Sequence, residues 1–555
     1  MTQNDNFDVP GTLRIFHDSG ESAPNHGEIT LIPTPSDDPQ DPLNWSRGRK
    51  LIQIACLLWY TFASAFSVAS LSAIYVPLTE ATGLTLDQLN AGSGYSYFLI
   101  GLSTLIFQPA ALAYGKRPVY ILSNVAACGL QVWTAYVSGN SQWIARCLLL
   151  GFMGGPSFSL VEVSIADISF LHERATPMGL YVCVLYLGAL LGPMVCGYVY
   201  TGLGWKAIIW LTSALYGANA IILLIFLEET NFKCAVPYLS SEATLNLPVK
   251  GGDDCLPLSE GGVKDDDLQD KVSPDTQAHA AIPVASPRPI SSWPGPNLRQ
   301  FGKLSPYSKG IMWRGLVQPL ALTVSPIVFC CGIIYGIYQV YFNMIAYLSS
   351  GVLSYPPYNF SADSVGLTYL SPAITTLPGA FFGGYVADWY TLRMARANNG
   401  ICEPEHKLRL FAIPTILVPI GLLMMGLGPY YGAHWIVYVL GEGVLNAAGP
   451  LATTLILAYA FDCFHPIYPD DLTGVHASVQ DAAPYLTATI SIAMCLTFGF
   501  GYAITPWAFT WGLKNFAISA ALSSLAFNCL VLLLYIFGKR LRRSGHHYYR
   551  KVINW

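Results

Sequence analysis

The chain reads Leu-Gly-Ala-Leu-Leu-Gly-Pro-Met-Val-Cys-Gly from Leu187 to Gly197, inside an apolar run that covers about residues 178–200. A run of this length can cross a bilayer as one helix. Its glycines, which would let another helix backbone approach closely, are Gly188, Gly192 and Gly197. Pro193 removes one helical hydrogen bond and bends the helix. We therefore expect a bent, closely packed membrane helix, although ordinary packing of small residues would give the same pattern.

The composition indicates a membrane protein. Of the 555 residues, 53% are hydrophobic and only 11% are charged, whereas soluble domains carry about 25% charged residues. The net charge of −4 is too small to favour nucleic acid as a partner. The 13 cysteines form no Cys-x-x-Cys pair, and the loops expected outside the membrane hold none of them. We predict neither a disulfide framework nor a metal site.

Twelve apolar runs divide the chain into two sets of six. Their approximate ranges are 51–76, 92–113, 119–137, 143–165, 179–200 and 206–227, then 317–346, 366–387, 411–428, 434–459, 485–507 and 514–538. Between the sets the chain fills with Asp, Ser, Pro and Gly, which is typical of a linker. We predict an all-α membrane protein with twelve transmembrane helices. Its parts would be a disordered tail (1–50), a six-helix half (51–230), a disordered linker (231–312), a second six-helix half (313–540) and a short tail (541–555).

Basic residues predict the orientation of the spans, because Lys and Arg gather in cytosolic loops. Almost all of them lie at one end of the predicted spans: Arg47, Arg49, Lys50, Lys116, Arg117, Arg174, Arg393, Arg396, Lys407, Arg409, Lys539, Arg540, Arg542 and Arg543. We place this end and both termini in the cytosol, with no cleavable signal peptide. Asn359 in Asn359-Phe360-Ser361 then lies outside, where it is a glycosylation candidate. Asn44, in the same pattern, would be cytosolic.

Several of these stretches resemble one family. The set Gly188, Gly192, Pro193 and Gly197 resembles the antiporter signature in the fifth span of the major facilitator superfamily. The plan of six spans, a linker and six spans is also that superfamily's plan. The stretches 41–50, 162–181 and 395–410 resemble fungal drug:proton antiporters, in a branch that includes yeast polyamine and histidinol transporter relatives. The resemblance implies the major facilitator fold, alternating access and a proton gradient, with no cofactor, as the energy source.

Charged residues at the inner ends of the spans are candidates for a gate. In the first half these are Lys116, Arg117, Glu162, Asp167, Glu173 and Arg174, and in the second half Asp388, Arg393 and Arg396. Lys116 and Arg117 belong to a loop that resembles a superfamily signature, although Leu112 stands at its acidic position. We expect opposite charges to pair here and hold the outward-facing state closed, at about 1 kcal/mol per pair where water reaches them. Solvated charges at helix ends would give the same pattern.

Glu442 is the most informative single residue. It lies about eight residues into the tenth apolar run, roughly 12 Å below the outer boundary at ~1.5 Å per residue. By sequence position, every other acid near a span, including Asp388, Glu228 and Asp462, falls at a span end. A carboxylate at this depth costs ~2.5–3.5 kcal/mol on insertion scales, so it normally faces a cavity and has a role. We predict that Glu442 carries a proton, holds a cationic substrate or alternates between both; a structural acid is the alternative.

Further candidates for substrate or proton binding accompany Glu442. They are Tyr335, Tyr338, Gln339 and Tyr341 in the seventh run, Asn446 one turn from Glu442, and Arg146 in the fourth run. Aromatic faces in a cavity suit flat or cationic solutes, but a stripe of tyrosines at helical spacing is more often packing. The superfamily places an arginine four residues before a glycine, whereas Arg146 lies five before Gly151, which is about 100° around a helix.

These features predict a fungal proton-coupled secondary transporter that exports a small amphipathic or cationic organic molecule by alternating access. We expect a monomer in the lipid bilayer of the plasma membrane rather than the vacuole, with substrate and protons as its partners and no nucleic acid. The rivals are proton-coupled import of polyamines or a related cationic nutrient, and a non-transporting receptor on the same fold. The chain contains no G-x4-G-K-[ST], H-E-x-x-H or G-x-S-x-G motif, so we expect neither an enzyme nor an ATP-driven pump.

Overall fold

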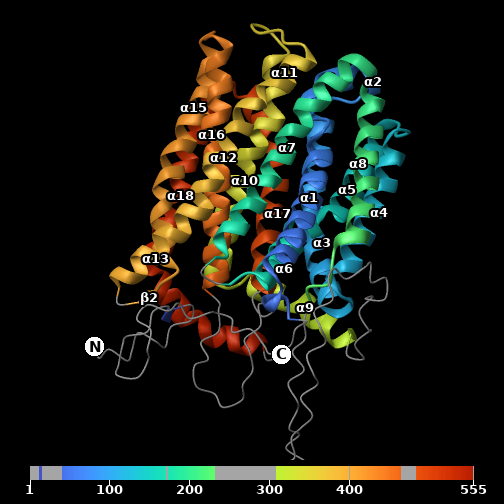
Figure 1. The fold of residues 1–555 in the computed structure, drawn as a ribbon. Coiled ribbons are helices and arrows are strands. Elements are labelled where there is room, and N and C mark those ends of the chain that lie inside the picture. The colour runs from blue at the N-terminus through green and yellow to red at the C-terminus, as the bar shows by residue number, and fades with distance from the viewer. Residues whose placement is uncertain are drawn as a thin grey trace, which may run out of the picture. The chain divides into compact units, whose positions relative to one another are not determined.

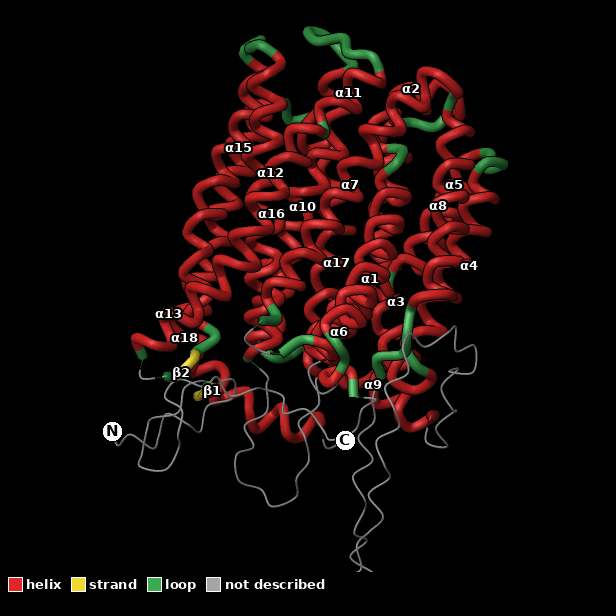
Figure 2. Tube along the Cα trace, in the orientation of Figure 1, coloured by secondary structure: helices red, strands yellow, loops and turns green. Residues whose placement is uncertain are grey.

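The computed structural model describes residues 12–14, 41–170, 173–231, 308–398, 400–463 and 483–553. Most of these residues are helical, and the long helices run side by side as a bundle (Figure 1). Short loops connect the helices at both ends of the bundle (Figure 2). The described ranges contain one small antiparallel sheet, in which β1 (Leu13–Arg14) pairs with β2 (Ile401–Cys402). Most of the predicted linker and of the amino-terminal tail lies outside the described residues.

The first set of apolar runs forms eight helices. They are α1 (Arg47–Ala69), α2 (Tyr75–Thr82), α3 (Leu86–Tyr114), α4 (Lys116–Thr134), α5 (Gly139–Gly154), α6 (Pro156–Ile168), α7 (Ala175–Leu203) and α8 (Trp205–Phe226). The 3-10 turns η2 (Pro42–Asn44) and η3 (Ser72–Ile74) flank α1. The fourth run is divided at Pro156, which begins α6 because proline suits the first position of a helix. Thr85 and Gln88 begin α3 with a capping box, which satisfies two free backbone donors.

The second set forms the remaining helices. They are α9 (Ser308–Leu322), α10 (Pro326–Leu353), α11 (Ala362–Thr368), α12 (Leu370–Phe381), the π-helical turn η4 (Phe382–Val386), α13 (Ala387–Ala397), α14 (Glu405–Leu408), the 3-10 turn η5 (Arg409–Phe411), α15 (Ala412–Tyr430), α16 (Trp435–Asp462), α17 (Ala483–Phe509) and α18 (Leu513–Ile553). The predicted limits of the seventh span, 317–346, are wrong. Pro326 starts a new helix there, so α9 is separate and α10 extends to Leu353.

Ten helical segments of the described residues are long and apolar enough to cross a membrane. The two predicted spans outside that set fall in α4 and in α12 with its neighbours. α4 is more polar because it contains Asn124 and Gln131, whose amides donate to the Tyr216 carbonyl and the Thr212 hydroxyl of α8, both at 2.7 Å. α12 is short because the π-helical turn η4 separates it from α13. All twelve apolar runs are nevertheless helical.

The helix α7, which contains the glycine set, packs closely on both sides. A Cβ atom at Gly188 would lie 2.8 Å from the Phe62 carbonyl oxygen of α1, so these two backbones are in direct contact. At Gly197 the same atom would lie 2.7 Å from the Ala362 carbonyl oxygen of α11. In Figure 1, α7 runs between α1 and α12. α7 therefore joins the first half of the chain to the second.

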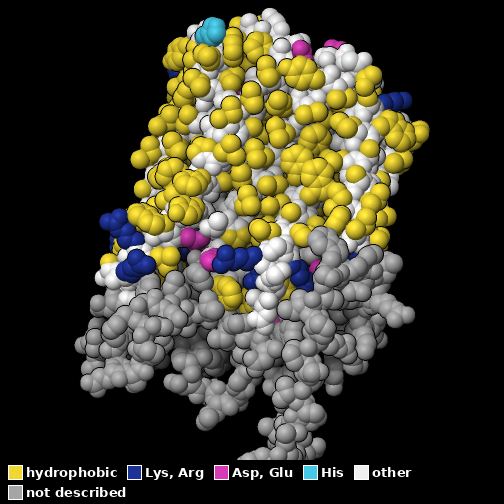
Figure 3. Space-filling model, viewed as in Figure 1, with side chains coloured by type: hydrophobic (Ala, Val, Ile, Leu, Met, Phe, Trp, Pro, Cys, Tyr) yellow, Lys and Arg dark blue, Asp and Glu magenta, His cyan; other side chains and the backbone are white. Residues whose placement is uncertain are grey.

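Charged side chains gather at one end of the bundle. Hydrophobic side chains cover the visible face along most of its length, and Lys and Arg lie mainly below them (Figure 3). We call this the basic end: α6 finishes there, α7 begins there, and α13 lies there (Figure 1). The opposite end contains α2 and α11. The separation of an apolar belt from a basic end is the pattern expected of a protein in a bilayer.

Candidate functional site

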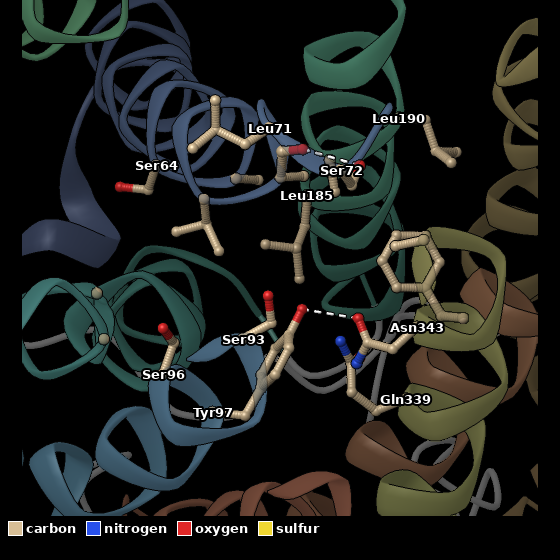
Figure 4. A pocket seen from close by; sticks show the side chains of 18 of the residues that line it. Ser64, Leu71, Ser72, Ser93, Ser96, Tyr97, Leu185, Leu190, Gln339 and Asn343 are labelled. Atoms are coloured by element: carbon tan, nitrogen blue, oxygen red, sulfur yellow. Dashed lines mark hydrogen bonds between the residues drawn. The ribbon is translucent and has the colours of Figure 1, made fainter. Parts of the chain in front are cut away.

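A cavity lies inside the bundle and is lined from both halves of the chain (Figure 4). It encloses about 1130 Å³, counting the space at its open side. Six helices of the first half (α1, α2, α3, α5, α6 and α7) contribute to its wall, and α10 and Tyr369 contribute from the second half. The polar lining side chains are Ser64, Ser72, Ser93, Ser96, Tyr97, Arg146, Ser157, Gln339 and Asn343, with the tyrosines Tyr75, Tyr186, Tyr347 and Tyr369. This mixture of polar and apolar side chains suits a small organic molecule.

Hydrogen bonds connect the two halves across the cavity wall. The Tyr97 hydroxyl of α3 donates to Asn343 Oδ1 of α10 at 2.7 Å, as Figure 4 shows. Asn343 Nδ2 has no hydrogen-bond partner among the described residues, and Gln339 Oε1 has none either. Buried polar atoms of this kind are normally satisfied. They therefore offer one donor and one acceptor to a molecule in the cavity.

Arg146 is the charged residue of the cavity wall. Its Nε donates to Thr134 Oγ1 at 3.2 Å, and its guanidinium carbon lies 4.9 Å from the centre of the Trp143 ring. It forms no ion pair with an acid in the part of the chain that the structure describes. The lining residues include no Asp or Glu. The predicted Arg146 therefore faces the cavity, despite its offset from the superfamily's position.

Glu442 is fully buried beside the cavity rather than in its wall. Its Oε1 accepts from the Ser349 hydroxyl of α10 at 2.5 Å, and its Oε2 has no partner among the described residues. The carboxylate also interacts electrostatically with Tyr369, which lines the cavity. The neighbouring Asn446 donates to the Pro372 carbonyl at 2.7 Å and to the Thr376 hydroxyl at 2.8 Å. One side chain, Tyr369, thus links Glu442 to the cavity.

Two of the three predicted tyrosines of α10, Tyr338 and Tyr341, lie on a different face of the helix from the cavity. Of the predicted candidates on α10, only Gln339 is a lining residue. The Tyr338 hydroxyl donates to Asn528 Oδ1 of α18 at 2.9 Å, and the Tyr338 ring stacks edge-on against Tyr341. Tyr335 is buried one turn before Gln339. Tyr338 and Tyr341 therefore pack α10 against its own half in this conformation.

Charge pairs at the basic end follow the predicted lattice only in part. Lys116 forms an ion pair with Asp167. The backbone N–H groups of Lys116 and Arg117 donate to the Glu229 carboxylate at 2.9 Å and 3.1 Å, an acid that sequence reasoning missed. Glu173 is exposed, and Glu162 is buried at a distance from these charges within α6. The contacts of Lys116 and Arg117 hold α4 within its own half.

Two other contacts at the basic end cross between the halves. The Thr176 backbone N–H and hydroxyl of α7 donate to Asp388 Oδ2 of α13, at 2.9 Å and 2.8 Å. Burial raises the pKa of Asp388 to about 6, although Lys407 and the Thr176 bonds oppose the shift. The Arg174 guanidinium lies 4.3 Å from the Phe461 ring of α16, and burial lowers its pKa to about 10. We call the Thr176–Asp388 contact the latch. Arg393, also on α13, lies over the Trp389 ring, and Arg396 is on the same helix.

We expect Asp388→Ala to loosen the basic end. Two hydrogen bonds to a carboxylate are worth about 1.5–3 kcal/mol each, so amide exchange over residues 175–185 should increase at least several-fold at pH 7.5. In the wild type, protonation of Asp388 as the pH falls through about 6 weakens the latch, so the protection of these amides, relative to their intrinsic exchange rate at each pH, should fall between pH 7.5 and pH 5. Hydrogen–deuterium exchange in nanodiscs measures both effects. Asp87→Ala, at an exposed site, should change neither, and a pH response that persists in Asp388→Ala would refute the assignment.

A second group of ion pairs fastens the basic end of the second half. Lys407 pairs with Asp462 at 2.6 Å, Lys539 with Glu403 at 2.7 Å, and Arg542 with Glu405 at 2.7 Å. These three ion pairs join α14 and Glu403 just before it to the ends of α16 and α18. The predicted tail 541–555 begins inside α18, which stays helical through Ile553. The glycosylation candidate Asn359 is exposed at the opposite end and stays a prediction.

Comparison with protein families decides the family. The family model of the Major Facilitator Superfamily matches residues 57–486, which is well over half of the chain. The chain belongs to the major facilitator superfamily. The predicted family and the predicted fold, all-helical with twelve membrane helices in two halves, are thereby confirmed. A family of membrane transporters also confirms that the chain is not an enzyme.

Fungal members of the superfamily match nearly the whole chain. An uncharacterized MFS-type transporter of Schizosaccharomyces pombe is 25% identical, covering 99% of this chain and 95% of the relative. Protein HOL1 of Saccharomyces cerevisiae is 26% identical, covering 98% and 97%. Among solved structures, the proton:xylose symporter XylE matches with a TM-score of 0.54 and 13% identity, covering 89% of this chain and 96% of XylE. At that identity the likeness to XylE concerns the fold alone.

Proposed function

We propose that this superfamily member is a proton-coupled secondary transporter that moves a small amphipathic organic molecule by alternating access. The observation that carries the proposal is the position of the cavity, which is lined by helices of both halves and lies above the latch. Movement of one half against the other opens the wall at one end while it closes the other. A molecule held by Gln339, Asn343 and Tyr97 would then face each side of the membrane in turn.

The buried Glu442 supports the proton part of the proposal. A carboxylate without a positive partner in a membrane interior is expected to bind a proton, because the charged form is costly there. Since Tyr369 touches the cavity and interacts with Glu442, a ligand that displaces Tyr369 would change the surroundings of the carboxylate. Ligand binding and proton release would thereby be coupled. The proton gradient is then the energy source, without a cofactor.

Export at the plasma membrane is the direction that we propose. The glycine set of α7 resembles the antiporter signature, and the basic end is the end that Lys and Arg would keep in the cytosol. One chain supplies every lining residue of the cavity in the described ranges, so a monomer suffices. The absence of an acid from the described cavity wall gives import of a polyvalent cation less support than export of an amphipathic molecule.

Proteoliposomes with an imposed pH gradient test the proposal. A library of amphipathic compounds is added to vesicles containing the full chain, and pyranine fluorescence inside them reports proton movement. We expect at least one compound to accumulate in vesicles with an acidic interior and to release protons from them, which is exchange. Accumulation only with an acidic exterior would instead establish import together with protons. If no compound moves with protons in either arrangement, the protein is not a proton-coupled transporter.

A further inference from the structure

Glu162 is a second carboxylate inside the bundle, and it has no hydrogen-bond partner among the described residues. Its side chain is 2% exposed, and neither carboxylate oxygen forms a hydrogen bond with any residue that the structure describes. It also forms no ion pair within those ranges. A buried acid used only for structure is normally hydrogen-bonded, because burying it without a partner is costly. Glu162 therefore requires another explanation.

The position of Glu162 relates it directly to the cavity. Residues four apart in the sequence share a helix face. On each of three helices, a cavity-lining residue therefore shares its face with a residue that lies one turn closer to the basic end. The pairs of lining residue and deeper residue are Phe158 and Glu162 on α6, Leu185 and Tyr181 on α7, and Gln339 and Tyr335 on α10. These deeper residues form a layer beneath the cavity. We call it the lower layer.

Electrostatic interactions link the three members of the lower layer. The carboxylate of Glu162 interacts electrostatically with the hydroxyl groups of Tyr181 and Tyr335. The Tyr181 hydroxyl donates to the Ser157 carbonyl at 2.8 Å, so its proton is used elsewhere and Glu162 is left without it. Tyr181 belongs to the first half and Tyr335 to the second, so movement of the halves separates the two tyrosines whose hydroxyl groups interact with the carboxylate.

We propose that Glu162, Tyr181 and Tyr335 form a subsite for a protonated amine, which becomes accessible when the basic end opens. The carboxylate supplies the opposite charge, and the two aromatic rings are suited to contact with an ammonium group. The cavity above, with neutral polar and apolar walls, would hold the uncharged body of the same molecule. The preferred substrate is therefore an amphipathic amine. This inference rests on the proposed transport function and makes its substrate class specific.

The two buried acids then have different roles. Glu162 lies in α6 of the first half, towards the basic end, and Glu442 lies in α16 of the second half, nearer the opposite end. Glu442 already accepts a hydrogen bond from Ser349 and does not line the cavity, so it is less open to a bulky cation. Cargo on Glu162 and the proton on Glu442 would occupy sites in opposite halves.

Matched pairs of amines and alcohols test the subsite. The probes are 2-phenylethylamine with 2-phenylethanol, and 4-phenylbutylamine with 4-phenylbutanol, titrated calorimetrically into the full chain in nanodiscs. We expect the wild type to bind one or both amines about tenfold or more tightly than the matching alcohol. Glu162→Gln should remove that preference without weakening alcohol binding, and Glu162→Asp should keep part of it. The exposed Glu80 provides the control Glu80→Gln, which should keep all of it.

Two results would overturn the subsite. One is equal binding of amine and alcohol by the wild type, and the other is an amine preference that survives in Glu162→Gln. Thermal unfolding of Glu162→Leu separates a binding role from a structural one. Because the carboxylate has no partner, this variant should unfold at the same temperature as the wild type or higher. A clear decrease would show that Glu162 stabilises the fold and would refute the subsite.

The flux assay distinguishes this inference from the proposed function. Amine binding that depends on Glu162, without proton-linked flux of any compound, would leave the subsite standing and remove the transport function. Proton-linked amine flux that is equal in the wild type and Glu162→Gln would leave the function standing and remove the subsite.

Discussion

Glu442→Gln is expected to abolish proton-driven accumulation while the cavity still binds its ligand. Glutamine has nearly the shape of glutamate and its carbonyl oxygen can still accept from Ser349 Oγ, but it cannot take up a proton. We expect accumulation driven by a pH gradient to fall by about 100-fold, which corresponds to ~2.7 kcal/mol of coupling free energy. The measurement is uptake into proteoliposomes of a compound found in the flux screen, at equal protein density.

Exchange without a pH gradient is the internal control for that experiment. Glu442→Gln should still exchange labelled for unlabelled compound between vesicles and medium at equal pH, because this step needs no net proton transfer. Asp87→Asn, an equal loss of negative charge at an exposed position, should behave as the wild type in both assays. If Glu442→Gln accumulates the compound within twofold of the wild type, Glu442 does not carry the coupling proton.

Gly192→Val should prevent α1 and α7 from packing and give little functional protein. A Cβ atom at Gly192 would lie 2.5 Å from the Phe66 carbonyl oxygen, which is backbone and cannot move unless the two helices separate. Overpacking in a well-packed interior costs about 1–3 kcal/mol and sometimes more, a large part of the stability of a typical domain. We expect a lower unfolding temperature and aggregation on size-exclusion chromatography.

The same helix provides the matched control. Gly202 also lies in α7, but a Cβ atom there would meet nothing within 4 Å. Gly202→Val makes the identical chemical change and should elute and unfold as the wild type does. If Gly192→Val and Gly202→Val are indistinguishable, close approach of α1 and α7 is not required for the fold.

The sequence was sufficient for the helices because a bilayer leaves few options for an apolar segment. The backbone must satisfy its own hydrogen bonds in lipid, so each of the twelve runs is helical. The depth of a residue along a helix can also be predicted from the sequence, since it needs only a count of residues at a constant rise. Glu442 accordingly lies at position eight of α16, as the sequence indicates. The break at Pro326 was missed because proline is tolerated both inside and at the start of a membrane helix.

The direction in which a side chain points was harder to predict from the sequence. Tyr338, Tyr341 and Gln339 lie within one turn of each other on α10, yet of these three only Gln339 lines the cavity, because the packing of other helices decides which face is covered. Glu162 was expected among the gate charges, since its run seemed to end near residue 165; α6 continues to Ile168 and keeps it inside. Glu229 was missed because its partners are the backbone amides of Lys116 and Arg117, which leave no sequence pattern.

Close contacts at two distant points of α7 limit how the halves can move. Gly179 touches Gly384 near the basic end, where a Cβ atom would lie 2.9 Å from the Gly384 Cα, and Gly197 touches Ala362 nearer the other end. The two glycines are about 27 Å apart at 1.5 Å per residue. When the two halves tilt against each other, one of these two helix contacts must separate while the other is kept. An inhibitor small enough to wedge into either seam would stall the cycle without competing for the central cavity.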